Sequence, residues 1–416
     1  MRVFKFGGAS VKDANGVKNL AEVLKTAGYN NTLVVVSAMG KTTNAMEVVI
    51  KNYFENKAEL QSAIQDSVKF HNEIVLDLFA NEQHKVFADV KLFFDELVLF
   101  FKTNKSPDYN FVYDQVIGFG ELVSTTIISH YLNEIGLNTK WIDVRTLIKT
   151  DSYYRRANVN WEQTQQNISS KFNTNSLNIT QGFLASDINN FTTTLGREGS
   201  DYTAAIFGYC LNAHSVTIWK DVPGVLNADP RYFENAQLLH QISYREAIEL
   251  AFYGASVIHP KTLQPLQQKE IPLYVKSFLN PKNEGTCVSK DLALNPQTPC
   301  FIVKKNQILI AISSLDFSYI MEENISEIFS LLHLYKMKVD VIQNSAISFS
   351  VCVDNLYNNL EKLVQHLKSK FKVTCHNNVS LYTIRHYNNV AVKALEKDKT
   401  ILLKQLTQET IQIVTK

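Results

Sequence analysis

The sequence predicts a three-layer αβα protein with a mostly parallel central sheet, followed by a smaller α+β region of ferredoxin-like plan. Two observations lead to this fold class. Over the first forty residues a strand, a helix and a strand follow one another, and a βαβ unit places its two strands parallel in one sheet. After a proline-containing stretch at 294–300, the expected order becomes strand, helix, strand, strand, helix, strand, which is the ferredoxin-like arrangement.

The bulk composition narrows the class of protein. A chain of 416 residues suggests two or three domains, and 45% hydrophobic residues can form a large core. The 42 Lys and Arg against 40 Asp and Glu leave a net charge of +2, which argues against a nucleic-acid-binding protein. The five cysteines form no CxxC pair, which favours a reducing compartment over disulfides or a thiolate zinc site. Without a signal-peptide pattern or a long apolar run, the sequence predicts a cytoplasmic protein with no membrane partner.

The first domain is predicted from apolar periodicity and glycine turns. Residues 2–6 form a short strand that runs into glycines, 12–28 has helical spacing, and 32–39 is an apolar, β-branched run typical of a buried strand. The range 41–106 contains neither Gly nor Pro, which predicts two or three helices in an excursion from the sheet over about 41–110. Further strands are expected at 139–144, 178–185, 214–219 and 271–278, and further helices at 120–134, 200–212 and 243–254.

The second domain follows the linker at 294–300, where two prolines stand in a short polar stretch. The expected strands are 307–313, 338–343, 346–353 and 372–383, and the expected helices are 322–336 and 356–370. The range 384–416 is predicted to add one more strand–helix–strand piece.

Two common nucleotide-binding motifs are not present. The "GKTT" at 40–43 resembles the end of a P-loop, but that motif needs a glycine at the position of Val35. The "GFGELV" at 118–123 lacks the third glycine of a dinucleotide fingerprint. We therefore exclude both a P-loop and a Rossmann site.

Glycines and polar residues instead follow several expected strands. In "KFGGAS", Lys5 ends a strand and the glycines after it let the backbone approach a ligand, although a solvated turn is the alternative. In "VVSAMGKTTN", Ser37 and Thr43 follow a buried strand, where they either bind a small polar ligand or form turns and caps. Glu121 opens an expected helix, where a carboxylate complements the helix dipole.

The stretch "TTTLGREGSDYTAA" (192–205) predicts an anion site. Its glycines free the backbone just before an expected helix, and a helix N-terminus binds anions. An aspartate among phosphate-binding groups suggests metal or proton chemistry. The charged and hydroxyl side chains gathered here are Arg197, Glu198, Ser200 and Asp201.

The strand ends together carry cations, hydroxyls and a few carboxylates, namely Lys5, Ser37, Arg197, Asp201, Lys220, Asp221 and Arg231. This mixture suits a polyphosphate with Mg²⁺ and requires no covalent nucleophile, because phosphoryl transfer depends mostly on positioning and charge neutralisation. Arg231 has an alternative role, since it can pair with Asp229 in the same loop.

Six motifs, in order, resemble those of the aspartate kinases, which have the amino-acid kinase fold. They are "KFGGAS", "VVSAMGKTTN", "GELVST", "QGF" with "TTTLGREGSDYTAA", "IWKDVPGVLNADPR" and "YGASVIHPKT". The resemblance covers residues 2–290, and the second domain resembles an ACT regulatory module. It implies a catalytic domain at 1–295 and an ACT-like regulatory and dimerisation region at 296–416.

The resemblance implies an enzyme that uses ATP to phosphorylate the side-chain carboxylate of L-aspartate. The product is 4-phospho-L-aspartate, the first intermediate toward lysine, threonine and methionine. Mg²⁺ would bind mainly through the phosphates, and no metal site on the protein is implied. The acceptor carboxylate is already ionised at pH 7, so no strong general base is required.

The resemblance also implies a role for each matching residue. Lys5 would bridge the phosphates and stabilise the transferring group, while Arg197 would clamp a substrate carboxylate and Asp201 would organise the centre. The remaining nucleotide-binding residues would be Gly7, Gly8, Ser10, Lys220, Asp221 and Arg231. The remaining aspartate-binding residues would be Ser37, Thr43, Glu121, Phe183 and Ser200, with Glu121 taking the ammonium group.

Three positions depart from the family pattern. Glu198 stands where relatives often have Gly, and its carboxylate either repels phosphate or points to solvent. Leu226 replaces a commonly aromatic residue of the nucleotide loop. Ser256 replaces a common Lys on the nucleotide side, a loss for which Lys261 is a candidate to compensate.

The ACT-like region predicts regulation by an amino acid such as lysine or threonine, with one full and one abbreviated ACT unit. Polar residues on or beside its second strand are the effector candidates, namely Asp340, Gln343 and Asn344. The alternative is a region that only makes a homodimer. Two further functions stay open for the whole chain: a kinase for another acceptor, such as acetylglutamate or glutamate, and a catalytically silent amino-acid sensor.

Overall fold

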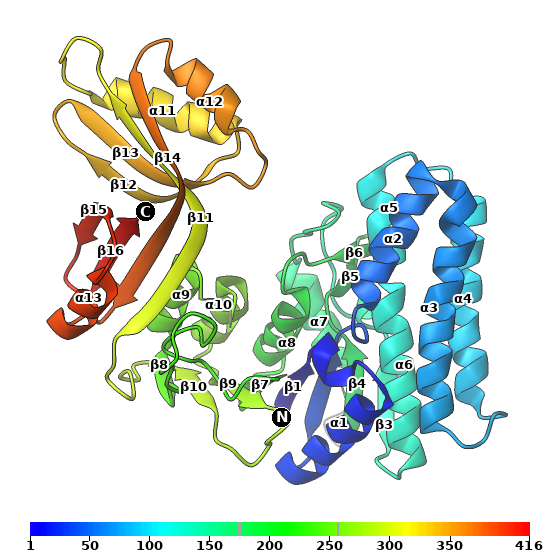
Figure 1. Ribbon diagram of the computed structural model, residues 1–416. Coiled ribbons are helices and arrows are strands. Elements are labelled where there is room, and N and C mark those ends of the chain that lie inside the picture. The colour runs from blue at the N-terminus through cyan, green and yellow to red at the C-terminus, as the bar shows by residue number, and fades with distance from the viewer. Residues whose placement is uncertain (173–175, 256–257) are drawn as a thin grey trace. The chain divides into compact units, whose positions relative to one another are not determined.

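The computed structural model describes residues 1–172, 176–255 and 258–416, and it divides into two compact units (Figure 1). The first unit comprises 1–225, 238–247 and 258–293, and the second comprises 226–237, 248–257 and 294–416. Two short segments from within the predicted catalytic domain thus join the second unit. The division into a catalytic domain at 1–295 and a regulatory region at 296–416 stays a prediction.

An eight-stranded sheet with the order β3-β4-β2-β1-β7-β9-β10-β8 forms the centre of the first unit. Its strands are β1 (Arg2–Phe6), β2 (Thr32–Val36), β3 (Thr139–Ile142), β4 (Leu177–Gln181), β7 (Ser215–Lys220), β8 (Gln241–Ser243), β9 (Leu273–Ser277) and β10 (Thr286–Ser289). The pairings are parallel except for β9 with β10, which confirms the expected mostly parallel sheet. Parallel strands require crossover connections, which are usually helices that cover both faces of the sheet.

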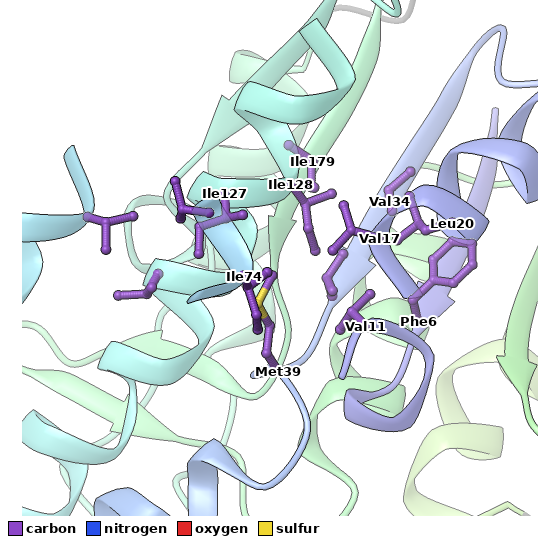
Figure 2. Packing of buried hydrophobic residues seen from close by; sticks show 14 of the residues in the cluster. Phe6, Val11, Val17, Leu20, Val34, Met39, Ile74, Ile127, Ile128 and Ile179 are labelled. Atoms are coloured by element: carbon purple, nitrogen blue, oxygen red, sulfur yellow. The ribbon is translucent and has the colours of Figure 1, made fainter. Parts of the chain in front are cut away.

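Helices supply these crossovers. They are η1 (Gly8–Val11), α1 (Ala14–Ala27), α6 (Phe119–Glu134), η2 (Val144–Thr146), α7 (Trp161–Lys171), α8 (Gly199–Cys210) and α10 (Pro260–Gln268). The helix α9 (Tyr244–Tyr253) begins in this unit and ends in the second one. Alternate residues of β1 point to opposite faces, so Phe4 and Phe6 enter the apolar core with α1 and α6, whereas Lys5 faces the other layer. Figure 2 shows side chains of β1, β2, β4, α1 and α6 meeting in this core.

The helical excursion contains α2 (Thr42–Glu55), α3 (Lys57–Leu78), α4 (Lys85–Thr103) and α5 (Tyr109–Ile117). Helices α3, α4 and α6 pack beside one another (Figure 1). Ile74 on α3 contributes to the same core as Met39, which follows β2 (Figure 2). The excursion is therefore built on the sheet's own core.

The strand predicted at 178–185 is interrupted. Phe183 has a φ of 71°, a left-handed conformation that ends the extended backbone, and β4 stops at Gln181. The chain then forms a separate antiparallel hairpin from β5 (Leu184–Ser186) and β6 (Thr192–Thr194). This hairpin delivers the chain to the start of α8.

The second unit contains a six-stranded sheet with the order β12-β13-β11-β14-β16-β15. Its elements are β11 (Cys300–Ser313), α11 (Glu322–Leu334), β12 (Lys338–Asn344), β13 (Ser348–Asp354), α12 (Leu360–Leu367), β14 (Lys372–Arg385), α13 (Asn389–Glu396), β15 (Ile401–Leu406) and β16 (Thr410–Thr415). The first six give the expected ferredoxin-like plan, with α11 and α12 packed on one face of the strands (Figure 1). The range 384–416 was wrongly predicted as strand–helix–strand, because α13 is followed by a hairpin.

Candidate active site

Four neighbouring strands end at the same edge of the first unit's sheet. Phe6 lies in register with Val36 of β2 and with Trp219 of β7, and Val36 lies in register with Gln181 of β4. Residues that follow these strands therefore gather at one edge, where ligands of open α/β sheets bind. The predicted site residues Lys220, Gly7, Ser37 and Phe183 all stand at or just beyond these strand ends.

Buried Lys5 and Asp201 and half-buried Lys220 form a group of charges, termed the charge cluster. Asp201, in the first turn of α8, lies 2.7 Å from Lys5 Nζ and 3.6 Å from Lys220 Nζ. Burial alone raises the pKa of Asp201, but the two ammonium groups outweigh burial and hold the pKa below its usual value. Asp201 is thus ionised at neutral pH, and the cluster carries two positive charges against one negative.

The glycine turn after β1 packs closely against the segment after β2. A Cβ on Gly8 would lie 2.8 Å from the carbonyl oxygen of Ala38, so only glycine fits there. A Cβ on Gly7 would lie 3.2 Å from Lys5 Nζ, which places the ammonium over the turn. Ser10, in η1, is buried, and its hydroxyl has no hydrogen-bond partner among the described residues. In the described part of the chain, the Ser10 hydroxyl is thus free to donate a hydrogen bond to a ligand.

Glu121 is buried in the first turn of α6, next to the same edge. Its Oε2 atom has no hydrogen-bond partner within the described ranges. Burial raises the pKa of Glu121 to about 8, although the Ala38 N–H and the charge of Lys5 act in the opposite direction. A buried carboxyl group without a cationic partner is suited to receive one from a ligand.

The segment after β4, which carries Phe183, packs against the start of α8, which carries Ser200. A Cβ on Gly182 would lie 2.4 Å from Ser200 Cβ, so the glycine allows α8 to approach the strand end. The Phe183 N–H donates to Thr203 Oγ1 at 2.9 Å, and its carbonyl accepts from Leu195 N at 2.9 Å. These contacts fix the left-handed Phe183 beside the helix start.

Arg197 and Glu198 occupy the turn that precedes α8. Arg197 is exposed, and no ion pair to it is found in the described part of the chain. Glu198 has a φ of 52°, and its Oε2 atom is buried without a hydrogen-bond partner among the described residues. Of the two alternatives raised for the Glu198 carboxylate, the one in which it points to solvent is therefore wrong for this oxygen. Ser37 and Thr43 are half-buried.

The other predicted nucleotide residues are not members of the charge cluster. Asp221 is exposed directly after β7. Arg231 belongs to the second unit and makes a bidentate pair with Asp229, with a shortest distance of 2.6 Å, which is the alternative raised for it above. Leu226 also belongs to the second unit. Ser256 lies outside the described residues.

Lys261, the candidate to compensate for Ser256, belongs to the first unit near the start of α10. Its Nζ donates to the Leu195 carbonyl at 3.2 Å and lies 4.5 Å from the centre of the Tyr202 ring. Burial lowers the pKa of Lys261. This cation supports the turn before α8.

The effector candidates lie on and beside β12. Asp340 is nearly buried and lies 2.8 Å from Lys304 Nζ and 3.8 Å from Lys338 Nζ, so its carboxylate is already paired. Gln343 and Asn344 line a cavity of about 270 Å³ together with Ser345, Ser348, Ser350, His376 and neighbouring apolar residues.

One residue of this region was not predicted from the sequence. Asp114, on α5, is fully buried and accepts hydrogen bonds from the backbone of Arg155 and from Thr194, the last residue of β6. Burial raises the pKa of Asp114 to about 6, against the effect of these hydrogen bonds. The only sequence signal was an acidic residue among Val112, Val116 and Ile117, apolar positions of one helix.

The parallel sheet, the charge cluster at its carboxyl edge and the helix start beside it define a class of phosphotransferase. Residues 1–277 match the amino acid kinase family, and the chain belongs to this family. Among its relatives, lysine-sensitive aspartokinase 3 of Escherichia coli is 31% identical over 364 residues, which cover 85% of this chain and 78% of that protein. Within the family, the chain therefore belongs with the aspartokinases.

Further relatives agree with this placement. Bifunctional aspartokinase/homoserine dehydrogenase 2 of Arabidopsis thaliana is 30% identical over 89% of this chain, but the chain spans only 42% of that protein's length. The crystal structure of E. coli aspartokinase III with lysine and aspartate has a TM-score of 0.84 at 26% identity and covers 100% of this chain and 95% of that one. In residues 1–172, 176–255 and 258–416, no helix is long and apolar enough to cross a bilayer.

Proposed function

We propose that the protein transfers the γ-phosphoryl group of ATP to the side-chain carboxylate of L-aspartate, giving 4-phospho-L-aspartate and ADP. The observation that carries this proposal is the charge cluster, where the Lys5 and Lys220 ammonium groups flank one ionised carboxylate at the carboxyl edge of the sheet. E. coli aspartokinase III has been crystallised with aspartate and ADP, and it is 25% identical to this chain with a TM-score of 0.80.

In the proposed reaction, an oxygen of the acceptor carboxylate forms a bond to the γ-phosphorus, while the bond from that phosphorus to the β–γ bridging oxygen breaks. Negative charge grows on the bridging oxygen and spreads over the transferring group, and Lys5 stabilises it there. Asp201 holds Lys5 and Lys220 in place without becoming a nucleophile. No protein group has to accept a proton, since the acceptor is already an anion.

The other proposed roles are those that the resemblance to the aspartate kinases implies. The backbone and hydroxyl of Gly7, Gly8 and Ser10 would bind phosphate, with Lys220, Asp221 and Arg231 as further nucleotide contacts. Glu121 would take the ammonium group of aspartate and Arg197 a carboxylate, while Ser37, Thr43, Phe183 and Ser200 would complete the acceptor site. Mg²⁺ would enter with ATP and neutralise charge on its phosphates, which supply the oxygen ligands that this ion prefers.

An assay of ADP formation tests the proposal. With Mg-ATP, we expect turnover that depends on L-aspartate, and a hydroxylamine trap should recover the acyl phosphate. Equal rates with and without aspartate would contradict it. Acetylglutamate and glutamate in the same assay test the other kinase assignment, and calorimetry that detects a bound amino acid without turnover would instead support a silent sensor.

We also propose that the second unit binds a feedback amino acid, such as lysine or threonine, and forms a homodimer. Strand β12 lies at the edge of its sheet and pairs with no strand on its other side among the described residues, and the β11–α11 loop exposes the large apolar residues Leu315, Phe317, Tyr319 and Met321. Unpaired edges and exposed apolar patches favour association. Light scattering should give the mass of a dimer. Phe317→Asp should weaken the dimer, whereas the matching substitution Leu356→Asp, at an exposed residue outside this loop, should not.

A cytoplasmic location and a role in lysine, threonine and methionine synthesis stay proposals that depend on the aspartate kinase reaction. Lysine or threonine added to the assay tests the regulatory part. Inhibition that is lost on changing Gln343 or Asn344, with the uninhibited rate retained, would support an effector site beside β12.

A further inference from the structure

A short segment before α7, residues 151–158 and here termed the strap, lies along the β5–β6 hairpin. The Ala157 N–H donates to the Thr194 carbonyl at 2.9 Å. A Cβ placed on Gly196 would lie 3.1 Å from Arg156 Cβ and 3.3 Å from the Arg155 carbonyl oxygen. The strap therefore touches both the end of β6 and the turn at 195–198 that carries Arg197.

Asp114, on α5, joins the strap to the hairpin through its one buried carboxylate. Both of its oxygens accept from the Arg155 N–H, at 3.0 and 2.9 Å. Its Oδ2 also accepts from Thr194 N at 2.9 Å, and its Oδ1 accepts from Thr194 Oγ1 at 2.9 Å. Arg155 has a φ of 71°, so the strap bends where Asp114 holds it, and the Arg155 guanidinium lies 4.4 Å from the centre of the Tyr113 ring.

We propose that Asp114 is a positioning residue of the acceptor site: by fixing Thr194 and Arg155, it sets the turn at 195–198 so that Arg197 meets the carboxylate of the acceptor. The inference rests on the proposed function, because it assumes that Arg197 binds the acceptor. It assigns a task to the helical excursion, since α5 is the element that supplies Asp114.

Asp187 offers a matched control, because it joins the same two segments at the opposite end of the hairpin. It is also buried, and it accepts from Asn189 N, Phe191 N and Ser152 Oγ at 2.9 to 3.0 Å. Asp114 and Asp187 thus make similar numbers of hydrogen bonds, but only Asp114 contacts the residue that leads into the turn. A purely structural role predicts the same outcome for both substitutions.

The experiment compares Asp114→Asn with Asp187→Asn. An amide places a donor against N–H groups, because only one of its two ends can accept. For Asp114→Asn we expect KM for L-aspartate to rise about 10-fold, with KM for Mg-ATP unchanged within about twofold. For Asp187→Asn we expect a lower melting temperature with both KM values unchanged within about twofold. An equal rise of KM for aspartate in both variants overturns the proposal, as does an equal change in both KM values of Asp114→Asn.

A second variant, Thr194→Val, tests the same contact with less risk of misfolding. Thr194→Val removes only the hydroxyl bond to Asp114, and we expect about a threefold rise in KM for aspartate. The double variant should be no worse than Asp114→Asn alone, because the two residues act through one contact, and additive effects contradict the inference.

Hydrogen exchange separates this inference from the proposed function. We expect the amides of 194–198 to exchange faster in Asp114→Asn and to keep the wild-type rate in Asp187→Asn, whatever the acceptor is. A wild-type protein that makes no ADP from aspartate refutes the proposed function. Unchanged exchange at 194–198 in Asp114→Asn refutes the positioning role.

Discussion

The charge cluster and the acceptor side of the candidate site differ in how their charges are balanced. In the cluster, Asp201 lies 2.7 Å from Lys5, so the buried ions stabilise one another without a ligand. On the acceptor side, Glu121 is buried with a free oxygen among the described residues, and Arg197 is exposed. The difference indicates that the proposed nucleotide side is organised in advance, whereas the proposed acceptor side lacks counter-charges that a ligand would supply.

Removal of Lys5 is the strongest way to break this comparison. Lys5→Ala deletes the proposed contact to the transferring group, and we expect kcat to fall about 10³-fold, the magnitude of losing one charge-stabilising donor. The substitution also leaves the buried Asp201 carboxylate with Lys220 as its remaining ion-pair partner, so the free energy of unfolding should fall too. Steady-state assays and thermal unfolding measure the two effects.

Lys5→Met separates the effect on kcat from the effect on packing, because it keeps an aliphatic side chain and removes only the charge. Lys25→Ala is the matched control, since Lys25 is exposed and pairs with Glu22 on the surface of α1. A Lys5→Met enzyme with more than a tenth of the wild-type kcat would remove Lys5 from the reaction.

The second largest effect is expected at Glu121. Glu121→Gln keeps the shape but removes the charge that would face the acceptor's ammonium group, and we expect KM for aspartate to rise about 30-fold, as for a lost charge-assisted hydrogen bond. Calorimetric titration with aspartate measures the same loss directly. Unchanged affinity would show that the ammonium group binds elsewhere.

Although Glu121→Gln should weaken aspartate binding, it should make the folded protein more stable at high pH. The pKa of Glu121 is about 8 in the folded protein and near 4.5 in the unfolded chain. Between these values the folded state holds a proton that the unfolded state has released, so the contribution of Glu121 to stability falls as pH rises from about 4.5 to 8. We expect Glu121→Gln to unfold at a higher temperature than the wild type at pH 8.5, and the advantage to shrink at pH 5.

A pH profile sharpens the comparison further. Below pH 8 Glu121 is mostly neutral in the free protein, so an acceptor that needs its anion binds more weakly. We expect kcat/KM for aspartate to rise up to about 10-fold from pH 7 to pH 9 and kcat/KM for Mg-ATP to change less, because Asp201 stays ionised in this range. The slope should disappear in Glu121→Gln.

The sequence was informative where local rules decide the structure. Strand ends, glycine turns and the start of α8 follow from apolar alternation and from residues that only tight turns accept, so Lys5, Ser37 and Asp201 could be grouped in advance. The break at Phe183 could not be predicted, because a bulky residue with positive φ depends on its tertiary contacts with Thr203 and Leu195.

Ion pairs and hydrogen bonds between distant segments could not be predicted either, because they too depend on tertiary contacts. Asp340 was considered as an effector ligand, yet it is paired with Lys304 from another strand. The pair of Arg231 with Asp229, only two residues away, was by contrast one of the alternatives raised from the sequence. Asp114 joins three segments that are far apart in the chain, so nothing near it in the sequence marks its task. The charged residues of the site were predictable from the sequence, but their partners from distant segments required the fold.

The smallest effect is expected at Glu198, which stands in the turn before α8, in the sequence between Arg197 of the proposed acceptor side and Asp201 of the charge cluster. Its φ of 52° costs a non-glycine residue of order 1 kcal/mol, and its buried Oε2 lacks a hydrogen bond within the described residues. Its charge offsets part of this by complementing the start of α8. We expect Glu198→Gly to stabilise the fold by about 0.5–1 kcal/mol, measured by denaturant unfolding, and to lower KM for Mg-ATP about threefold by removing an anion near the phosphates. Glu198→Asn should give the same change in KM, because asparagine also accepts this conformation and carries no charge. A rise in KM for Mg-ATP in both variants would instead show that the carboxylate assists nucleotide binding.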